Sequence, residues 1–176
     1  MQSLGRMRDI VTGNLVSEAE QLGYKEIIIV GKPTKIESTM KVSFAYIVGD
    51  KDYSKLSKIR KNYDYLIGKG DRKAFENKHI EFILPDMEIS KDHTHYRNSG
   101  MDQILAKIAK TKKKTILFDL SLIRKSKNRQ QILGRMMQNA RLCKKYKVPF
   151  EFVTFAGNNL ELKTPKDLKA LSRVLT

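Results

Sequence analysis

Short apolar runs alternate with stretches of helical periodicity along most of this chain. Several of the runs are almost continuously apolar, which is typical of strands buried on both faces, as in parallel sheets. The predicted strands are residues 26–30, 42–48, 63–67, 80–84, 115–118 and 150–155, with a weaker candidate at 7–11.

Helical patterns fall between these runs. They cover residues 12–22 and 52–61 and begin again at Ser99, Asn128 and Thr164. Ser99 and Asp102 have the spacing of a capping box, in which each side chain accepts a backbone N–H of the first turn. Pro165 suits the first turn of the last helix, where its missing N–H costs no hydrogen bond.

Alternating strands and helices predict an α/β fold with a mainly parallel sheet. No internal repeat or linker divides the chain, so we expect one domain spanning residues 1–176. Six or seven strands fit either a small or incomplete β/α barrel or an open doubly wound sheet. The Gly-rich phosphate fingerprint of dinucleotide-binding folds is absent after the first strand.

Charge adds the strongest indication of a partner. The chain has 35 Lys and Arg against 19 Asp and Glu, a net charge of +16. Residues 1–90 hold 15 basic and 13 acidic side chains, whereas residues 91–176 hold 20 and 6. Between 107 and 147, 14 basic residues accompany a single acid, Asp119. Nucleic acid is the favoured partner, because its phosphates release counterions when Lys and Arg replace them.

Two further origins of this positive charge are less favoured. One is solvation of the protein at high salt or high temperature, and the other is attraction to an acidic membrane surface. Solvation strategies of this kind usually add acids together with lysines, and here the acids are missing.

The remaining composition predicts a cytoplasmic protein. The single cysteine, Cys143, allows no internal disulfide framework and suits a reducing compartment. The first residues lack the apolar run of a signal peptide. No stretch approaches the ~20 apolar residues of a membrane-spanning helix.

His93 and His95 have the spacing of a metal-binding pair, because alternate residues of a strand point to one face. A catalytic zinc would need a further ligand, from His79, Asp92 or Asp86. The pair also lies in a polar, loop-like segment just before a helix. We therefore favour loop histidines over a metal site.

No catalytic constellation stands out elsewhere. There is no G-x-S-x-G elbow and no Walker loop, and Cys143 lies on an apolar helical stripe, which favours a buried hydrophobe. Carboxylates are scarce where the positive charge gathers, which argues against a two-metal nuclease. The segment 67–73 could offer backbone N–H groups with Lys69 or Arg72 to a phosphate, but a plain strand-to-helix turn is favoured.

Basic residues gather in three clusters. These are Lys112–Lys114, then Arg124, Lys125, Lys127 and Arg129, and finally Arg141, Lys144, Lys145 and Lys147. The first cluster ends a predicted helix, where the helix dipole alone favours cations. The second follows a strand and lies at the carboxyl edge of a β/α sheet, the usual functional edge. Because no base-reading motif or interleaved aromatic residue accompanies them, the clusters favour contact with the backbone of a folded RNA.

The segment RNSGMDQILAKIAKTKKKTILFDLS (97–121) resembles the signature of the 30-kDa protein subunit family of ribonuclease P. RQQILGRMMQNARLCKKYKVPFEFVTFA (129–156) resembles the next family block, and TPKDLKALSRVL (164–175) the final helix. DIVTGN and AEQLGYKEIIIV resemble the opening segments. The chain is short for the family, its loop 124–128 is trimmed, and Gln103 follows the signature Asp where histidine is frequent.

The resemblance implies a TIM-barrel-like (β/α) fold, here incomplete, without the metal site of related phosphoesterase barrels. It implies a non-catalytic RNA-binding subunit that supports RNA-catalysed removal of the 5′ leader from precursor tRNA. The implied partners are the ribonuclease P RNA, precursor tRNA indirectly, and a small ferredoxin-like protein subunit. The protein itself would bind no cofactor, and Mg²⁺ would belong to the RNA active site.

On this basis we expect RNA contact at basic residues of the second half and assign no catalytic or metal-binding residues. The expected contacts are Arg97, Lys107, Lys112, Lys113, Lys114, Arg124, Lys125, Lys127 and Arg129. Two alternatives stay open. One is a metal-dependent phosphoesterase that uses His93 and His95, and the other is a basic scaffold that binds only a protein partner.

Overall fold

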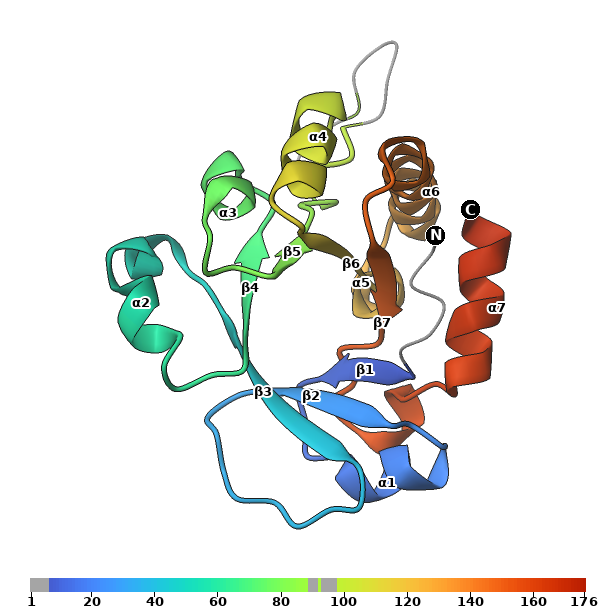
Figure 1. Cartoon of the computed structure of the whole chain (residues 1–176). Helices are drawn as coiled ribbons and strands as arrows, with labels where there is room; N and C mark the ends of the chain where they lie inside the picture. Colours follow the sequence, from blue (N-terminus) through green and yellow to red (C-terminus); the bar gives the residue numbers. More distant parts are fainter. Residues whose placement is uncertain (1–6, 89–91, 93–97) are drawn as a thin grey trace.

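The computed structural model describes residues 7–88, 92 and 98–176, which form a ring of parallel strands with helices outside it (Figure 1). Seven strands lie in chain order, each pairing in parallel with the next. They are β1 (Arg8–Val11), β2 (Glu26–Val30), β3 (Lys41–Ile47), β4 (Tyr65–Lys69), β5 (Phe82–Leu84), β6 (Thr115–Asp119) and β7 (Phe150–Val153). The helices are α1 (Val16–Gln21), α2 (Leu56–Ile59), α3 (Arg72–Glu76), α4 (Gln103–Thr111), α5 (Leu120–Lys125), α6 (Arg129–Tyr146) and α7 (Pro165–Leu175).

The two edge strands meet, so the ring is nearly closed. Val11 and Ala156 form an isolated parallel bridge. The Phe155 N–H donates to the Ile10 carbonyl at 2.9 Å, and the Thr12 N–H donates to the Ala156 carbonyl at 2.9 Å. The incomplete TIM-barrel-like fold is therefore confirmed, and the open doubly wound sheet is wrong.

A buried carboxylate fastens this seam. Asp9 of β1 is fully buried, and its Oδ1 accepts the N–H groups of Ile10 at 2.7 Å and Thr154 at 2.8 Å. Its Oδ2 lies 2.6 Å from the Thr154 hydroxyl. Burial raises the pKa of Asp9 to about 6, although the hydrogen bonds from Thr154 and Ile10 act to lower it.

Apolar side chains fill the ring from inside. They include Ile10, Ile28, Ala45, Ile67, Leu117 and Val153, one from each of six strands. Arg8 is also buried, at the amino end of β1, where its Nε donates to Glu151 of β7 at 2.8 Å. The Arg8 guanidinium lies 5.0 Å from the ring centroid of Phe82, so the ion pair sits on an aromatic face.

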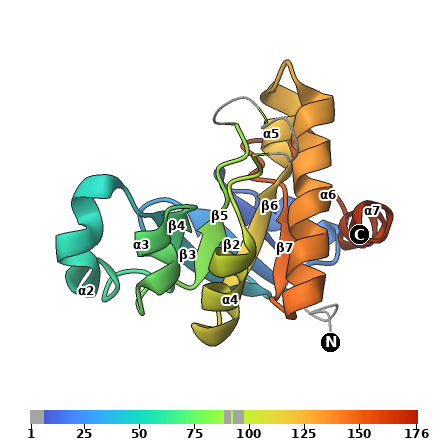
Figure 2. The same ribbon diagram turned by 90° about the horizontal axis from the view of Figure 1, so that it is seen from above.

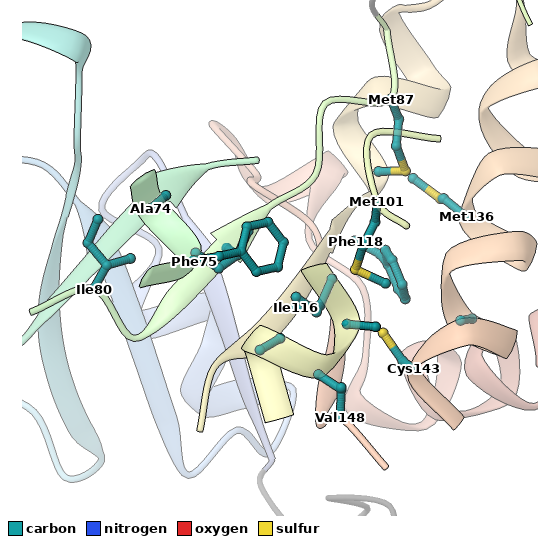
Figure 3. Close-up of a cluster of buried hydrophobic side chains, with 14 of the residues drawn as sticks. Ala74, Phe75, Ile80, Met87, Met101, Ile116, Phe118, Met136, Cys143 and Val148 are labelled. Carbon is teal, nitrogen blue, oxygen red and sulfur yellow. The ribbon is translucent and has the colours of Figure 1, made fainter. Parts of the chain in front are cut away.

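The largest core lies between the strands and the helices outside them. Figure 3 shows part of it, where Phe75 of α3, Ile116 of β6 and Cys143 of α6 meet. Burial raises the pKa of the Cys143 thiol to about 12, so this cysteine packs as a hydrophobe. A second cluster joins β1 and β2 to α1 and α7.

Two short helices were not predicted from the sequence, and one predicted helix cap is wrong. α3 and α5 have only 5 and 6 residues, too few to show an apolar stripe. The Ser99 cap is wrong, because α4 begins at Gln103 and Asp102 caps it by accepting the Leu105 N–H at 2.8 Å. The predicted start of the last helix is confirmed, because Thr164 caps α7 and Pro165 is its first residue. Asp167 completes a capping box with Thr164.

Asp9 gives a pH prediction. Because its pKa is raised in the folded state, its contribution to stability is full below the unfolded value and is lost as the pH rises through about 6. Asp9→Asn keeps an acceptor for both N–H groups but does not titrate. We expect the wild type to gain about 2 kcal/mol relative to Asp9→Asn between pH 7 and pH 4.5. Urea unfolding of both proteins across this pH range measures the difference. If the free energies of unfolding of the two proteins changed with pH in parallel, the raised pKa of Asp9 would be contradicted.

Candidate nucleic-acid interface

The basic residues that the sequence groups together lie at two opposite edges of the barrel. α4 runs into β6 at the amino ends of the strands, so Lys112 and Lys113 lie at that edge. Lys125, Lys127 and Arg129 follow β6 and α5 at the carboxyl edge. All five side chains are exposed. The predicted contacts therefore do not form one continuous surface.

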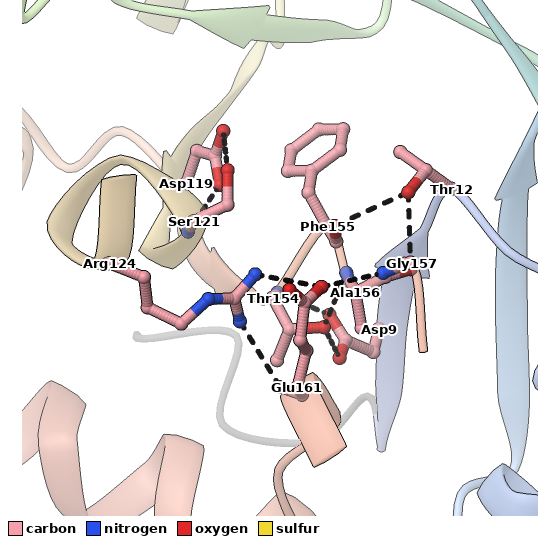
Figure 4. Close-up of polar contacts among 10 residues, drawn as sticks. All are labelled: Asp9, Thr12, Asp119, Ser121, Arg124, Thr154, Phe155, Ala156, Gly157 and Glu161. Atoms are coloured by element: carbon pink, nitrogen blue, oxygen red, sulfur yellow. Dashed lines mark hydrogen bonds and ion pairs between the residues drawn. The ribbon is translucent and has the colours of Figure 1, made fainter. Parts of the chain in front are cut away.

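Figure 4 shows polar contacts at the carboxyl edge, where ionisable side chains bind other groups of the protein. Asp119 accepts the Ser121 N–H at 2.7 Å and its hydroxyl at 2.9 Å, which caps α5. Burial raises the pKa of Asp119, against the lowering effect of Ser121. Arg124 forms an ion pair with Glu161, 3.0 Å from its Nη2 to Oε2. The Gly157 N–H donates to the same oxygen at 2.8 Å and lowers the pKa of Glu161.

These contacts change the role of Arg124. Its charge is compensated by Glu161, and its Nη1 also lies 3.4 Å from the Glu161 carbonyl oxygen. Arg124 thus ties α5 to the segment after β7. Among the predicted contacts at this edge, Lys125, Lys127 and Arg129 remain as exposed cations.

Lys114 is a correction to the predicted interface. It is only 2% exposed, and its ammonium donates to the carbonyl oxygens of Asn77 and Ile80. Burial lowers the pKa of this ammonium. Lys114 therefore holds the turn before β5 against β6 and cannot reach a phosphate. Lys112 and Lys113, beside it in the sequence, point to solvent.

Replacing these lysines should separate the two roles. Lys114→Met keeps the apolar stem but leaves two carbonyl groups without their donor, so we expect a loss of about 1–3 kcal/mol of stability. Lys112→Met should change stability by less than about 0.5 kcal/mol, because its side chain is exposed. Urea unfolding tests both variants. Equal stability losses would mean that the Lys114 contacts do not contribute.

The structure describes only some of the remaining residues that the sequence predicted as contacts or ligands. Lys107 is exposed on α4. Arg97, His93 and His95 lie outside the described residues. Two of the residues named above as candidate further metal ligands have partners within the protein. His79 Nε2 lies 3.3 Å from the Ser57 hydroxyl, and both carboxylate oxygens of Asp92 accept hydrogen bonds.

A polar stripe on α6 holds the long connection between β5 and α4. Arg135 is fully buried, and its Nε and Nη2 donate to Asp92 Oδ1 at 3.0 and 2.8 Å. Its Nη1 donates to the Met87 carbonyl at 2.6 Å. Gln131 donates to Asp92 Oδ2 at 3.1 Å, and Asn139 donates to the Ser99 carbonyl at 2.7 Å. Hydrogen bonds from Gln131 and Arg135 lower the pKa of Asp92 to about 2.

The sequence contained a signal for this stripe. Gln131, Arg135 and Gln138 recur at helical spacing on one face of α6, next to the apolar stripe that the sequence did reveal. A polar row beside an apolar stripe is also the pattern of a solvent-facing helix side, so the spacing alone does not show that these residues bind the chain before α4.

The glycine of the signature segment is needed for this docking. Gly100 has φ of +72°, in the left-handed region that favours glycine. A Cβ atom here would also lie 2.3 Å from the Asp86 carbonyl oxygen. The Ser-Gly pair thus lets the chain before α4 pass close to the segment after β5, while Asn139 holds Ser99.

Arg135 should be essential for the stability of this arrangement. Arg135→Lys loses the planar guanidinium that reaches Asp92 and Met87 together, so we expect a loss of about 2–4 kcal/mol. Arg141→Lys, on the exposed face of the same helix, is the matched control and should cost less than about 0.5 kcal/mol. Chemical denaturation of both variants tests this, and two equally stable variants would contradict it.

Within the part of the chain that the structure describes, no helix has the length and apolarity to cross a membrane.

Comparison with known proteins supports the family resemblance. No protein-family model matches the chain. Two of its curated relatives are named ribonuclease P protein component 3. The relative from Methanococcus maripaludis (strain C5) is 27% identical over 123 residues, which are 69% of this chain and 53% of the relative. The relative from Methanococcus vannielii is 25% identical over 163 residues, 92% of this chain and 67% of the relative. The chain thus spans about half the length of the first relative.

A solved structure has the same fold. It is described as a cryo-EM structure of archaeal ribonuclease P with mature tRNA, and one of its chains matches with a TM-score of 0.79 at 19% identity. The match covers 96% of this chain and 82% of that chain. This likeness confirms the barrel, and the curated relatives confirm the resemblance to the ribonuclease P protein family.

Proposed function

This chain is a relative of ribonuclease P protein component 3, and from that premise we propose that it is a non-catalytic, RNA-binding subunit of ribonuclease P. In this role it supports the RNA-catalysed removal of the 5′ leader from precursor tRNA. Its partners would be the ribonuclease P RNA, a small ferredoxin-like protein subunit and, indirectly, precursor tRNA. The Mg²⁺ ions of the reaction would belong to the RNA, and the compartment would be the cytoplasm.

The distribution of charge carries this proposal. Residues 103–114 and 138–147 contain nine basic side chains and no acidic one, and eight of the nine are exposed. A surface of this kind attracts a polyanion and gains free energy when condensed counterions leave the phosphates. Lysine is also depleted in protein–protein interfaces, which favours RNA over a protein partner for this surface.

The acidic side chains support a non-catalytic role. Asp9 fastens the barrel seam, Asp92 binds Arg135, Asp119 caps α5, and Glu161 pairs with Arg124. Asp92, Asp119 and Glu161 lie at or after the carboxyl ends of strands, where barrel enzymes place their catalytic residues, whereas Asp9 lies within β1. All four are bound by the protein's own donors. This arrangement favours a structural use of the carboxylates over hydrolysis by the protein.

Reconstitution tests the proposal. The catalytic RNA and the other protein subunits are assayed for precursor-tRNA cleavage with and without this chain. We expect stimulation that requires the RNA, and no cleavage by the chain alone. RNA affinity should fall steeply with salt, with a slope in log–log form of about 0.7–0.9 per phosphate contacted.

The phosphoesterase alternative predicts the opposite result. The chain alone would then cleave a phosphoester, and a chelator or His93→Ala would abolish the cleavage. Binding of a protein subunit without any RNA affinity would instead support the scaffold alternative.

A further inference from the structure

A groove of about 810 Å³ lies between α6 and the start of α4. One wall of the groove is the second half of α6, where Arg141 and Lys145 lie one helical turn apart. The other wall is the first turn of α4 together with the residues just before it. Figure 2 shows α4 beside the second half of α6, on the outside of the barrel. The volume lies in the range of ~300–1,000 Å³ that is usual for small-ligand sites.

The charge of the groove favours an anion. Arg141 and Lys145 are both exposed, and the two helices around them carry Lys107, Lys110 and Lys144 as well. Asp102 is the acid at the groove, and its Oδ1 accepts the Leu105 N–H at 2.8 Å. Its negative charge therefore balances the amino end of α4, and the cations of α6 have no acidic counterpart on their own helix segment.

The rest of the lining suits a nucleotide chain better than a simple anion. Met101, Leu105 and Leu142 supply an apolar floor, which accepts the faces of bases or riboses. Ser99 is buried and its hydroxyl accepts a hydrogen bond from Gln138, but Gln103 is exposed and supplies amide donor and acceptor groups at the groove. Such groups can bind base edges and the 2′-hydroxyl, the group that distinguishes RNA from DNA.

We propose that this groove binds a single-stranded segment of the ribonuclease P RNA, with its phosphates on Arg141 and Lys145. The proposal rests on the proposed function and names the RNA contact within it. It places the main contact on the outer flank of the barrel, between α4 and α6. The carboxyl edge, where Glu161 compensates Arg124, contributes less.

The polar stripe of α6 gives the groove its shape. Asn139 and Gln138 bind Ser99 on the side of α6 that faces the chain before α4. Arg141 and Lys145 follow on the exposed side. One helix thus holds a wall of the groove in place and presents cations to whatever enters it.

Three paired charge reversals test the proposal, because each lowers the net charge by the same amount. The first is R141E/K145E in the groove, and the second is K125E/K127E at the carboxyl edge. The third is K58E/K61E, two exposed lysines at and after α2 that serve as the control. Each protein is assayed for affinity to the ribonuclease P RNA over a range of salt concentrations, and for stimulation of precursor-tRNA cleavage in the reconstituted enzyme.

We expect R141E/K145E to weaken RNA affinity by at least tenfold more than either other pair and to lower the salt slope by about 1.5, the loss of two phosphate contacts. Equal losses of RNA affinity in all three paired variants, or a larger loss in K125E/K127E, would overturn the proposal that the groove binds RNA. If the wild-type chain neither binds the RNA nor stimulates cleavage, the proposed function itself fails. If R141E/K145E binds the isolated RNA normally but does not stimulate cleavage when the other protein subunits are present, the proposal is wrong and the groove binds a protein subunit.

A tethered nuclease gives a measurement that does not depend on charge. Gln103→Cys at the groove and Ser54→Cys near α2 each carry a thiol-linked iron chelate, while the native Cys143 is buried and does not react. Cleavage of one short RNA segment from position 103, absent from position 54, supports the proposal. The same weak pattern from both positions would contradict it. DNA of the same sequence, in excess, should not compete for the site.

Discussion

The hydrogen bonds between Asp9 and Thr154 join the two ends of the sheet, and the rest of the fold depends on that closure. These residues are 145 positions apart, so the contact joins the first and the last strand of the sheet. A parallel barrel with an open seam would expose two rows of backbone donors and acceptors. Here Asp9 accepts a backbone N–H from each of the two strands, and Gly13 passes so close to Gly157 that a Cβ atom would lie 2.6 Å from its carbonyl oxygen.

A second constraint arises from the unequal connections around this ring. The chain between β5 and α4 is long, and buried carbonyl groups near its two ends need donors. α6 supplies two of them, because Arg135 and Asn139 donate to the carbonyl groups of Met87 and Ser99. α6 is the longest helix of the described chain, with 18 residues, and this length lets it hold the connection and still present exposed cations toward its end. The same helix, α6, therefore both stabilises the connection and carries part of the exposed positive charge.

Much of the fold follows from the sequence, because periodicity is a local property. The strand 26–30 was predicted to the residue, since EIIIV is short, apolar and bounded by polar residues. The start of the last helix at Thr164 and Pro165 was also predicted correctly. α3 and α5 were not predicted, because each is short and the apolar residues of α5 adjoin those of the strand before it. The candidate site was less predictable, because it depends on which segments meet. Lys114 has the same local sequence as Lys112 and Lys113, and only the carbonyl oxygens of Asn77 and Ile80 decide that it turns inward. The basic clusters before and after β6 are neighbours in the sequence, but a strand separates them and carries them to opposite edges.

The surplus of positive charge can be understood from where the acids are used. Asp9, Asp92, Asp119 and Glu161 each bind donors of the protein itself and thereby hold the seam, the long connection or a helix end. Most of the lysines and arginines of residues 103–114 and of the second half of α6 have no such task; the exceptions are the buried Lys114 and Lys144, which donates to the Thr176 carbonyl oxygen at 2.8 Å. Their mutual repulsion costs stability, and a bound polyanion would relieve it. These carboxylates serve the structure of the barrel, and the exposed cations on and after α4 and on the second half of α6 give that flank a positive surface that suits a polyanion.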